Sequence, residues 1–118
     1  MFLERFVWRP LRYSLAGLAC LLRERAFREE LLVGGILWGI SFWRIGSCGP
    51  QALLTLAWGL VLLTEALNSA IESLVDLLSP RRHSLAKRAK DIGSAAVFIA
   101  VLSGLAIFAF CLTVSGHG

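Results

Sequence analysis

Four polar residues in the middle of the chain have a spacing that a helix would turn into one stripe. They are Glu65, Asn68, Glu72 and Asp76. Intervals of three, four and four residues place side chains on the same helical face. Three carboxylates on one stripe repel one another unless a positive charge lies among them. Glu65 also follows a long apolar run, and an ionisable group near membrane depth marks a functional site by default.

Charges that can neutralise this stripe lie across a predicted turn. Lys90 and Asp91 come one helical turn before Ser94, at the start of the last apolar run. A short loop joins the two predicted helices, so they run antiparallel and bring Lys90 to the stripe. Carboxylates suit a magnesium ion that also binds phosphate oxygens, and lysine neutralises charge on a phosphoryl group. A remaining carboxylate can accept the proton of an attacking hydroxyl.

The same residues permit a plainer interpretation, in which the stripe is the solvated end of a helix. That interpretation leaves Asn68 and the isolated Glu65 at the lipid boundary without a reason. Glu24, just before the first apolar run, is a further candidate metal ligand, although an i,i+4 surface pair with Arg28 is the simpler explanation. His83 lies in a basic loop with no second ligand nearby, so we expect at most a contact with phosphate.

Several other kinds of site are excluded. The sequence contains no GxxxxGK[ST], GxGxxG, HExxH or GxSxG motif, so any nucleotide site is unconventional. Three cysteines lie far apart without paired spacing, which argues against a zinc site. The net charge of +4 does not indicate nucleic acid, because the basic residues flank apolar runs where lipid headgroups and topology account for them.

The elements that must position the stripe are membrane helices. Of the 118 residues, 57% are hydrophobic, against about 45–50% in soluble domains, and the mean hydropathy is +0.71. Residues 1–30 place arginines and apolar residues at three-to-four spacing, which predicts an amphipathic helix in the membrane interface. Residues 31–45, 51–78 and 84–114 predict three membrane-spanning helices. The second exceeds a hydrocarbon core of about 30 Å, so its end emerges into water.

The distribution of lysine and arginine predicts the orientation. The N-terminal segment and the loop between the second and third spans are rich in both residues, whereas the C-terminal tail has neither. The positive-inside rule therefore places the N-terminus in the cytoplasm and the C-terminus outside. Three helices form a thin scaffold for a buried site, so we expect an oligomer.

Two segments carry a specific resemblance to a known family. EALNSAIESLVD at 65–76 and AKDIGSAAV at 89–97, with His83 between them, closely resemble the signature of the small prokaryotic diacylglycerol kinases. ERAFR at 24–28 resembles the ExxF segment of that family. The resemblance covers nearly the whole chain. It implies a homotrimer in the bacterial inner membrane, active sites shared between protomers, and ATP-dependent phosphorylation of a membrane lipid hydroxyl.

The resemblance also implies a role for each matching residue. Glu65 is the general base, with Asn68 beside it in the site, and Glu24 and Glu72 hold Mg²⁺. The residues implied to contact ATP are Glu72, Lys90, Asp91, Arg81, Arg82, His83, Arg9 and Tyr13. The residues implied to lie by the lipid are Ser94, Glu30, Ala26, Phe27, Arg28 and Ser14.

Two alternatives remain open from the sequence. Close relatives of these kinases phosphorylate undecaprenol; residues 76–80 resemble that branch, whereas residues 94–97 resemble the diacylglycerol branch, which we favour. A small non-catalytic helical membrane subunit would also explain the spans and the close-packing pair Gly35 and Gly39. It would not explain a carboxylate stripe that faces Lys90.

Overall fold

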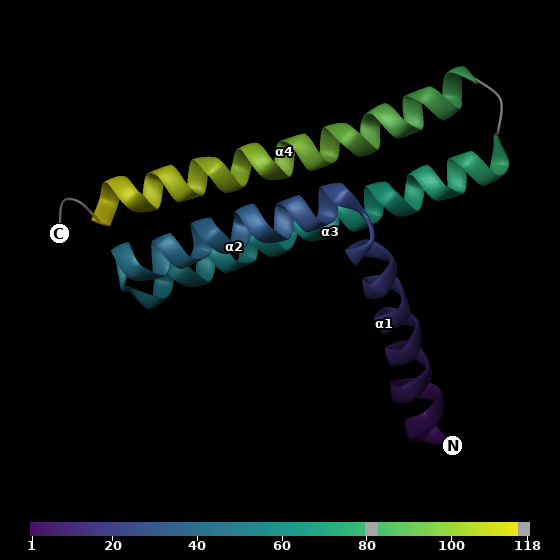
Figure 1. The fold of residues 1–118 in the computed structure, drawn as a ribbon, viewed down its shortest axis with the longest axis horizontal. Helices are drawn as coiled ribbons and strands as arrows, with labels where there is room; N and C mark the ends of the chain where they lie inside the picture. Colours follow the sequence, from purple (N-terminus) through teal and green to yellow (C-terminus); the bar gives the residue numbers. More distant parts are fainter. Residues whose placement is uncertain (80–82, 116–118) are drawn as a thin grey trace.

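Helices joined by short turns make up residues 1–79 and 83–115, the part described by the computed structural model, which agrees with the all-helical fold that the sequence predicts. Its elements are a π-helical turn η1 (Glu4–Trp8) and the helices α1 (Arg9–Leu22), α2 (Arg25–Ile45), α3 (Cys48–Leu78) and α4 (Ser84–Ser115). Helices α2, α3 and α4 lie alongside one another, and α1 projects steeply from the start of α2 (Figure 1).

The first 30 residues do not form the single helix predicted from their pattern. Helix α1 ends at Leu22, and Glu24 has an extended backbone with φ −84° and ψ 131°. The side chain of Glu24 accepts a hydrogen bond from Ser69 of α3, which anchors the chain at the bend. Helix α2 consequently begins at Arg25, earlier than the predicted residue 31.

A tight turn joins α2 to α3. Gly46 has φ +64° at the C-cap of α2, a left-handed conformation that glycine adopts without steric cost. Helix α3 starts at Cys48 rather than at residue 51 and carries Pro50 in its first turn, where the missing N–H has no helical partner to lose.

Hydrogen bonds inside the α2–α3 pair fix its register near this turn. Ser41 is completely buried, and its Oγ donates to the carbonyl of Trp38 at 2.7 Å. Gln51 Nε2 donates to the same carbonyl at 3.1 Å, and Trp38 Nε1 donates to Thr55 Oγ1 at 2.7 Å. Polar groups satisfied in this way hold helices together where apolar packing alone does not distinguish one register from another.

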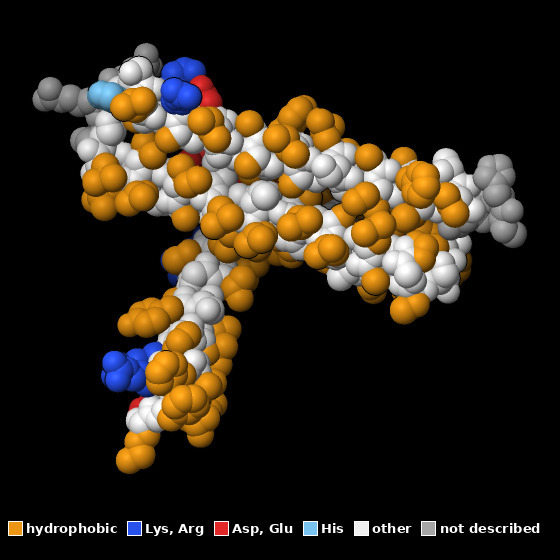
Figure 2. All heavy atoms as spheres, turned by 180° about the vertical axis from the view of Figure 1, so that it is seen from behind, with side chains coloured by type: hydrophobic (Ala, Val, Ile, Leu, Met, Phe, Trp, Pro, Cys, Tyr) orange, Lys and Arg blue, Asp and Glu red, His pale blue; other side chains and the backbone are white. Residues whose placement is uncertain are grey.

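Two of the described helices, α3 and α4, are long and apolar enough to cross a membrane. On the face drawn in Figure 2, hydrophobic side chains are spread along the three-helix part, while lysine and arginine gather near the α3–α4 loop and on α1. Large apolar residues such as Leu56, Phe98 and Leu102 are exposed. A surface of this kind is suited to lipid rather than to water.

The α4 backbone approaches the polar stripe closely at one glycine. Gly93 is buried, and a Cβ atom placed on it would lie 2.3 Å from Oδ1 of Asn68. No side chain fits in that space without moving the Asn68 amide. Gly93 therefore sets how near α4 comes to α3 beside the stripe.

We predict that Gly93→Ala lowers the free energy of unfolding in detergent by about 1–3 kcal/mol, the usual cost of overpacking. The matched control is Gly104→Ala on the same helix, where the added Cβ would meet Ala57 and Val61 at an ordinary 3.9 Å. Thermal unfolding followed by circular dichroism should show a loss for the first variant only. Equal stability of both variants would contradict the close approach at Gly93.

Candidate active site

The predicted polar stripe lies on one face of α3, and its first two members, Glu65 and Asn68, are buried. Glu65 is 8% exposed and Asn68 7% exposed. Asn68 Nδ2 donates to Glu72 Oε1 at 3.2 Å, which aligns the Glu72 carboxylate along the stripe. Oδ1 of Asn68 is buried and meets no hydrogen-bond donor within the described residues.

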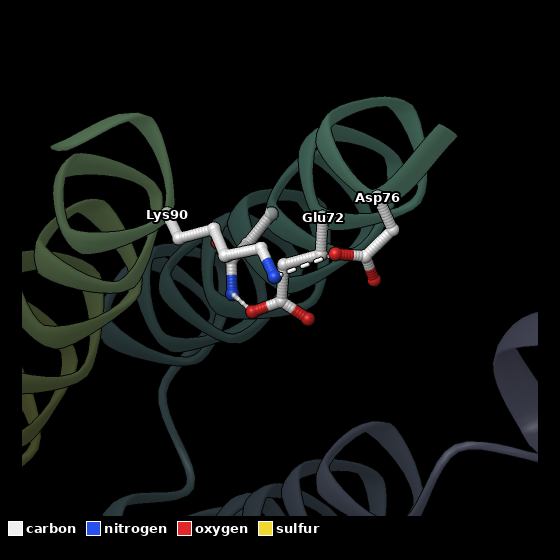
Figure 3. Close-up of polar contacts among 4 residues, drawn as sticks. Glu72, Asp76 and Lys90 are labelled. Atoms are coloured by element: carbon white, nitrogen blue, oxygen red, sulfur yellow. Dashed lines mark hydrogen bonds and ion pairs between the residues drawn. The ribbon is translucent and has the colours of Figure 1, made fainter. Parts of the chain in front are cut away.

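Lys90 of α4 reaches the stripe, as the antiparallel arrangement predicts. Its Nζ lies 2.6 Å from Oδ1 of Asp76 and points between Glu72 and Asp76 (Figure 3). Asp91, the next residue, is not brought to the stripe. Its carboxylate pairs with Lys87 Nζ at 2.7 Å one turn earlier on α4, because successive helical residues point about 100° apart.

Glu24 is held against the stripe by a residue that the sequence reasoning missed. Ser69 is buried, and its Oγ donates a hydrogen bond to Oε2 of Glu24. The described ion pairs include none between Glu24 and Arg28; the Glu24 carboxylate is bonded to Ser69 instead. Ser69 lies four residues after Glu65 and three before Glu72, the same intervals that define the stripe, so its spacing could have marked it as a further member.

A second carboxyl group accompanies Glu65. The side chains of Glu30 on α2 and Glu65 on α3 lie within hydrogen-bond reach of each other. Oε2 of Glu30 is buried and meets no N–H or O–H donor in the described part of the chain. Two carboxyl groups this close repel each other unless a proton or a cation lies between them, so the pair is suited to proton or cation exchange.

Several of these side chains line one open groove with a volume of about 670 Å³, whereas Glu30 lines a separate cavity beside Trp58. Its polar lining consists of Glu24, Arg25, Glu65, Asn68, Ser69, Glu72 and Ser94. Its apolar lining includes Ala26 of α2 together with Val97, Phe98 and Val101 of α4. The groove therefore presents carboxylates and an apolar wall to the same ligand, which suits an amphiphile.

The remaining predicted site residues lie elsewhere or outside the described ranges. Arg9, Tyr13 and Ser14 are on α1 and, like Phe27 and Arg28, are not part of the described lining of the groove. Phe27 is 5% exposed and packs into the apolar core.

The loop between α3 and α4 holds three more predicted contacts with ATP. His83 Nδ1 accepts a hydrogen bond from the N–H of Leu85 at 3.1 Å, which caps the start of α4. The predictions for Arg81 and Arg82 lie outside the described residues.

Comparison with known proteins gives a consistent assignment. The family model of prokaryotic diacylglycerol kinase matches residues 12–112. A diacylglycerol kinase of Pseudomonas aeruginosa is 48% identical over 90 residues, which cover 75% of this chain and 73% of that protein. One from Escherichia coli K12 is 39% identical over 106 residues, covering 89% and 85% respectively. The chain therefore belongs to the prokaryotic diacylglycerol kinase family.

Proposed function

We propose that this protein transfers the γ-phosphoryl group of ATP to the hydroxyl of diacylglycerol and so forms phosphatidic acid. Its family makes it an ATP-dependent lipid kinase of a bacterial membrane. The observation that carries the proposal is the buried Glu65 in a groove with an apolar wall on one side and the Lys90-paired stripe on the other. A lipid hydroxyl and a water-borne phosphate can meet only at such a boundary.

Glu65 is the general base in this proposal. Its carboxylate accepts the proton of the lipid hydroxyl while the hydroxyl oxygen forms a bond to the γ-phosphorus and the bond to the ADP oxygen breaks. Asn68 lies one turn further along the stripe and orients Glu72 through its amide. Catalysis of phosphoryl transfer rests mostly on such positioning and on charge stabilisation.

Glu24 and Glu72 are the proposed ligands of Mg²⁺. Within the described residues no three acidic, histidine or cysteine side chains are grouped closely enough to hold a metal ion. Mg²⁺ commonly takes only one or two carboxylates and completes its shell with water and phosphate oxygens, so the two glutamates fit an ion that arrives with ATP. Ser69 and Asn68 each donate to one of them, as groups that orient metal ligands do. The bound ion would neutralise phosphate charge.

Lys90, Asp91 and the loop residues Arg81, Arg82 and His83 are the proposed contacts of the nucleotide. Lys90 already faces Glu72 and Asp76 on the stripe (Figure 3), while Asp91 pairs with Lys87 on α4 and His83 caps the start of that helix. A lysine already placed among carboxylates can exchange them for phosphate oxygens when ATP binds.

The direction of α1 supports a homotrimer with shared sites. Helix α1 projects away from its own bundle (Figure 1) and leaves apolar residues such as Leu11, Leu15 and Leu18 exposed. In this proposal Arg9, Tyr13 and Ser14 contact ATP and the lipid in the groove of a neighbouring protomer.

The proposed arrangement in the membrane has three spans, with α2 as the first. The N-terminus and the α3–α4 loop face the cytoplasm, and the C-terminus faces outward. The amphipathic α1 lies in the cytoplasmic interface. The lipid glycerol lies beside Glu30, Ala26 and Ser94, with Phe27 and Arg28 supporting this end of α2.

Replacing the proposed base tests the catalytic assignment. Glu65→Gln should lower kcat by about 10²–10⁴-fold, because the amide cannot accept the hydroxyl proton, while the oligomer stays intact. Glu4→Gln, in the exposed η1 turn, is the control and should behave as wild type. Transfer from radiolabelled ATP to diacylglycerol in mixed micelles provides the measurement. Turnover near wild type in Glu65→Gln would refute the assignment of the base.

Loss of the Ser69 hydroxyl should loosen the proposed magnesium ligand Glu24. We expect Ser69→Ala to raise the Mg²⁺ concentration for half-maximal activity about tenfold, the usual effect of losing a group that orients a metal ligand. Ser73→Ala, one turn further along α3 on an exposed position, should leave it unchanged. The comparison is made by magnesium titration of both variants at saturating ATP. The same Mg²⁺ concentration for half-maximal activity in both variants would argue against Glu24 as a ligand.

The lipid assignment is tested by offering diacylglycerol and undecaprenol side by side. Diacylglycerol should be phosphorylated with the higher kcat/KM, in agreement with the relatives named as diacylglycerol kinases. A preference for undecaprenol would move the protein to the alternative function. Turnover of neither lipid would favour a non-catalytic membrane subunit.

A further inference from the structure

Trp58 is a large side chain that lies outside the lining of the groove. It lies on α3 seven residues before Glu65, which is two helical turns along the same face. Its side chain is half-buried and crosses towards α2. It is thus the apolar neighbour of the catalytic stripe on the side that faces the membrane interior.

The indole of Trp58 occupies a notch in α2 that only glycine provides. A Cβ atom added to Gly34 would lie 2.2 Å from Nε1 and 2.4 Å from Cδ1 of Trp58. Real Cβ atoms do not approach other atoms this closely. The ring is therefore seated directly on the α2 backbone, and its position along α2 is fixed by sterics.

A hydrogen bond then ties the indole to a particular residue of α2. Trp58 Nε1 donates to the backbone carbonyl of Glu30 at 3.3 Å, one turn before Gly34. In a medium without water an indole N–H needs such an acceptor. The notch and the hydrogen bond together hold the backbone of Glu30 at a fixed height against α3.

The residue held in this way is the one whose carboxyl group lies beside Glu65. Glu30 reaches Glu65 through its side chain while Trp58 binds its carbonyl. We propose that Trp58 is a positioning residue for phosphoryl transfer, because its indole in the Gly34 notch keeps the Glu30 carboxyl against the base. This inference rests on the proposed role of Glu65.

The conservative variant Trp58→Phe tests the hydrogen bond. Phenylalanine keeps an aromatic ring in the notch, whereas alanine would enlarge an apolar cavity of about 300 Å³ lined by Gly34, Leu54 and Trp58. We expect kcat to fall about fivefold, the effect of one lost hydrogen bond on the barrier, with KM for ATP and the unfolding temperature within error of wild type. Trp43→Phe, at a position 91% exposed, should change none of these.

A cycle with Glu30→Gln distinguishes positioning from general packing. If Trp58 acts through Glu30, Trp58→Phe should cause no further loss of kcat in the Glu30→Gln background, because the carboxyl that it positions is already gone. A fivefold loss in both backgrounds would show that Trp58 acts elsewhere and would overturn the inference.

The reciprocal substitution guards against misfolded protein. Gly34→Ala alone should lower kcat. In a Trp58→Ala background the notch is empty, so the loss of kcat caused by Gly34→Ala should be less than half as large. An equal loss of kcat in both backgrounds would contradict the seating of the Trp58 indole on Gly34. Absence of lipid phosphorylation by the wild-type protein would instead refute the proposed function, so the two failures are distinct.

Discussion

The whole arrangement depends on keeping carboxyl groups charged or exchangeable at the edge of a hydrocarbon layer. A lone carboxylate there is energetically costly, and hydrogen bonds and an ion pair offset that cost. Glu24 takes a hydrogen bond from Ser69, Glu72 takes one from Asn68, and Asp76 pairs with Lys90. The first and last of these contacts join side chains from different segments of the chain, which no single helix can align, so the charge state of the site depends on how the bundle packs.

Glu65 is the exception among these carboxylates, and this sets it apart chemically. The stripe's other acids have a donor or a cation, whereas Glu65 has Glu30 as its neighbour. A carboxyl group whose nearest partner is another carboxyl group gains from taking up a proton or a cation. That property is what a base at a lipid hydroxyl requires.

Sequence patterns predicted the helices and the stripe because both depend on local spacing. The positions of Glu65, Asn68, Glu72 and Asp76 on one face follow from helical geometry alone. The approach of Lys90 follows from a short loop.

Most features that the sequence did not reveal depend on contacts with another helix. The ion pair of Asp91 with Lys87 does not, because it spans i,i+4 on α4 and follows from local helical spacing. Ser69 lies 45 residues from its partner Glu24 in the sequence, and Trp58 lies 24 residues from Gly34. No helical periodicity connects the members of either pair. The bend at Glu24 is likewise a tertiary effect, since the residues around it suit a continuous helix.

Because the stripe lies on a helix, the depth of the site in the bilayer can change only in steps when residues are inserted into α3 or deleted from it. One residue inserted between the apolar half of α3 and Glu65 would lift the carboxylate by about 1.5 Å but rotate it by about 100°, away from α2 and α4. An insertion of three or four residues returns it to nearly the same face, but moves it by about 5 Å in one step. Gradual tuning of depth by insertion or deletion is therefore closed to this architecture. A lineage adapting to a thicker or thinner bilayer would have to change residues on the lipid-facing sides of the helices and leave the length of α3 alone.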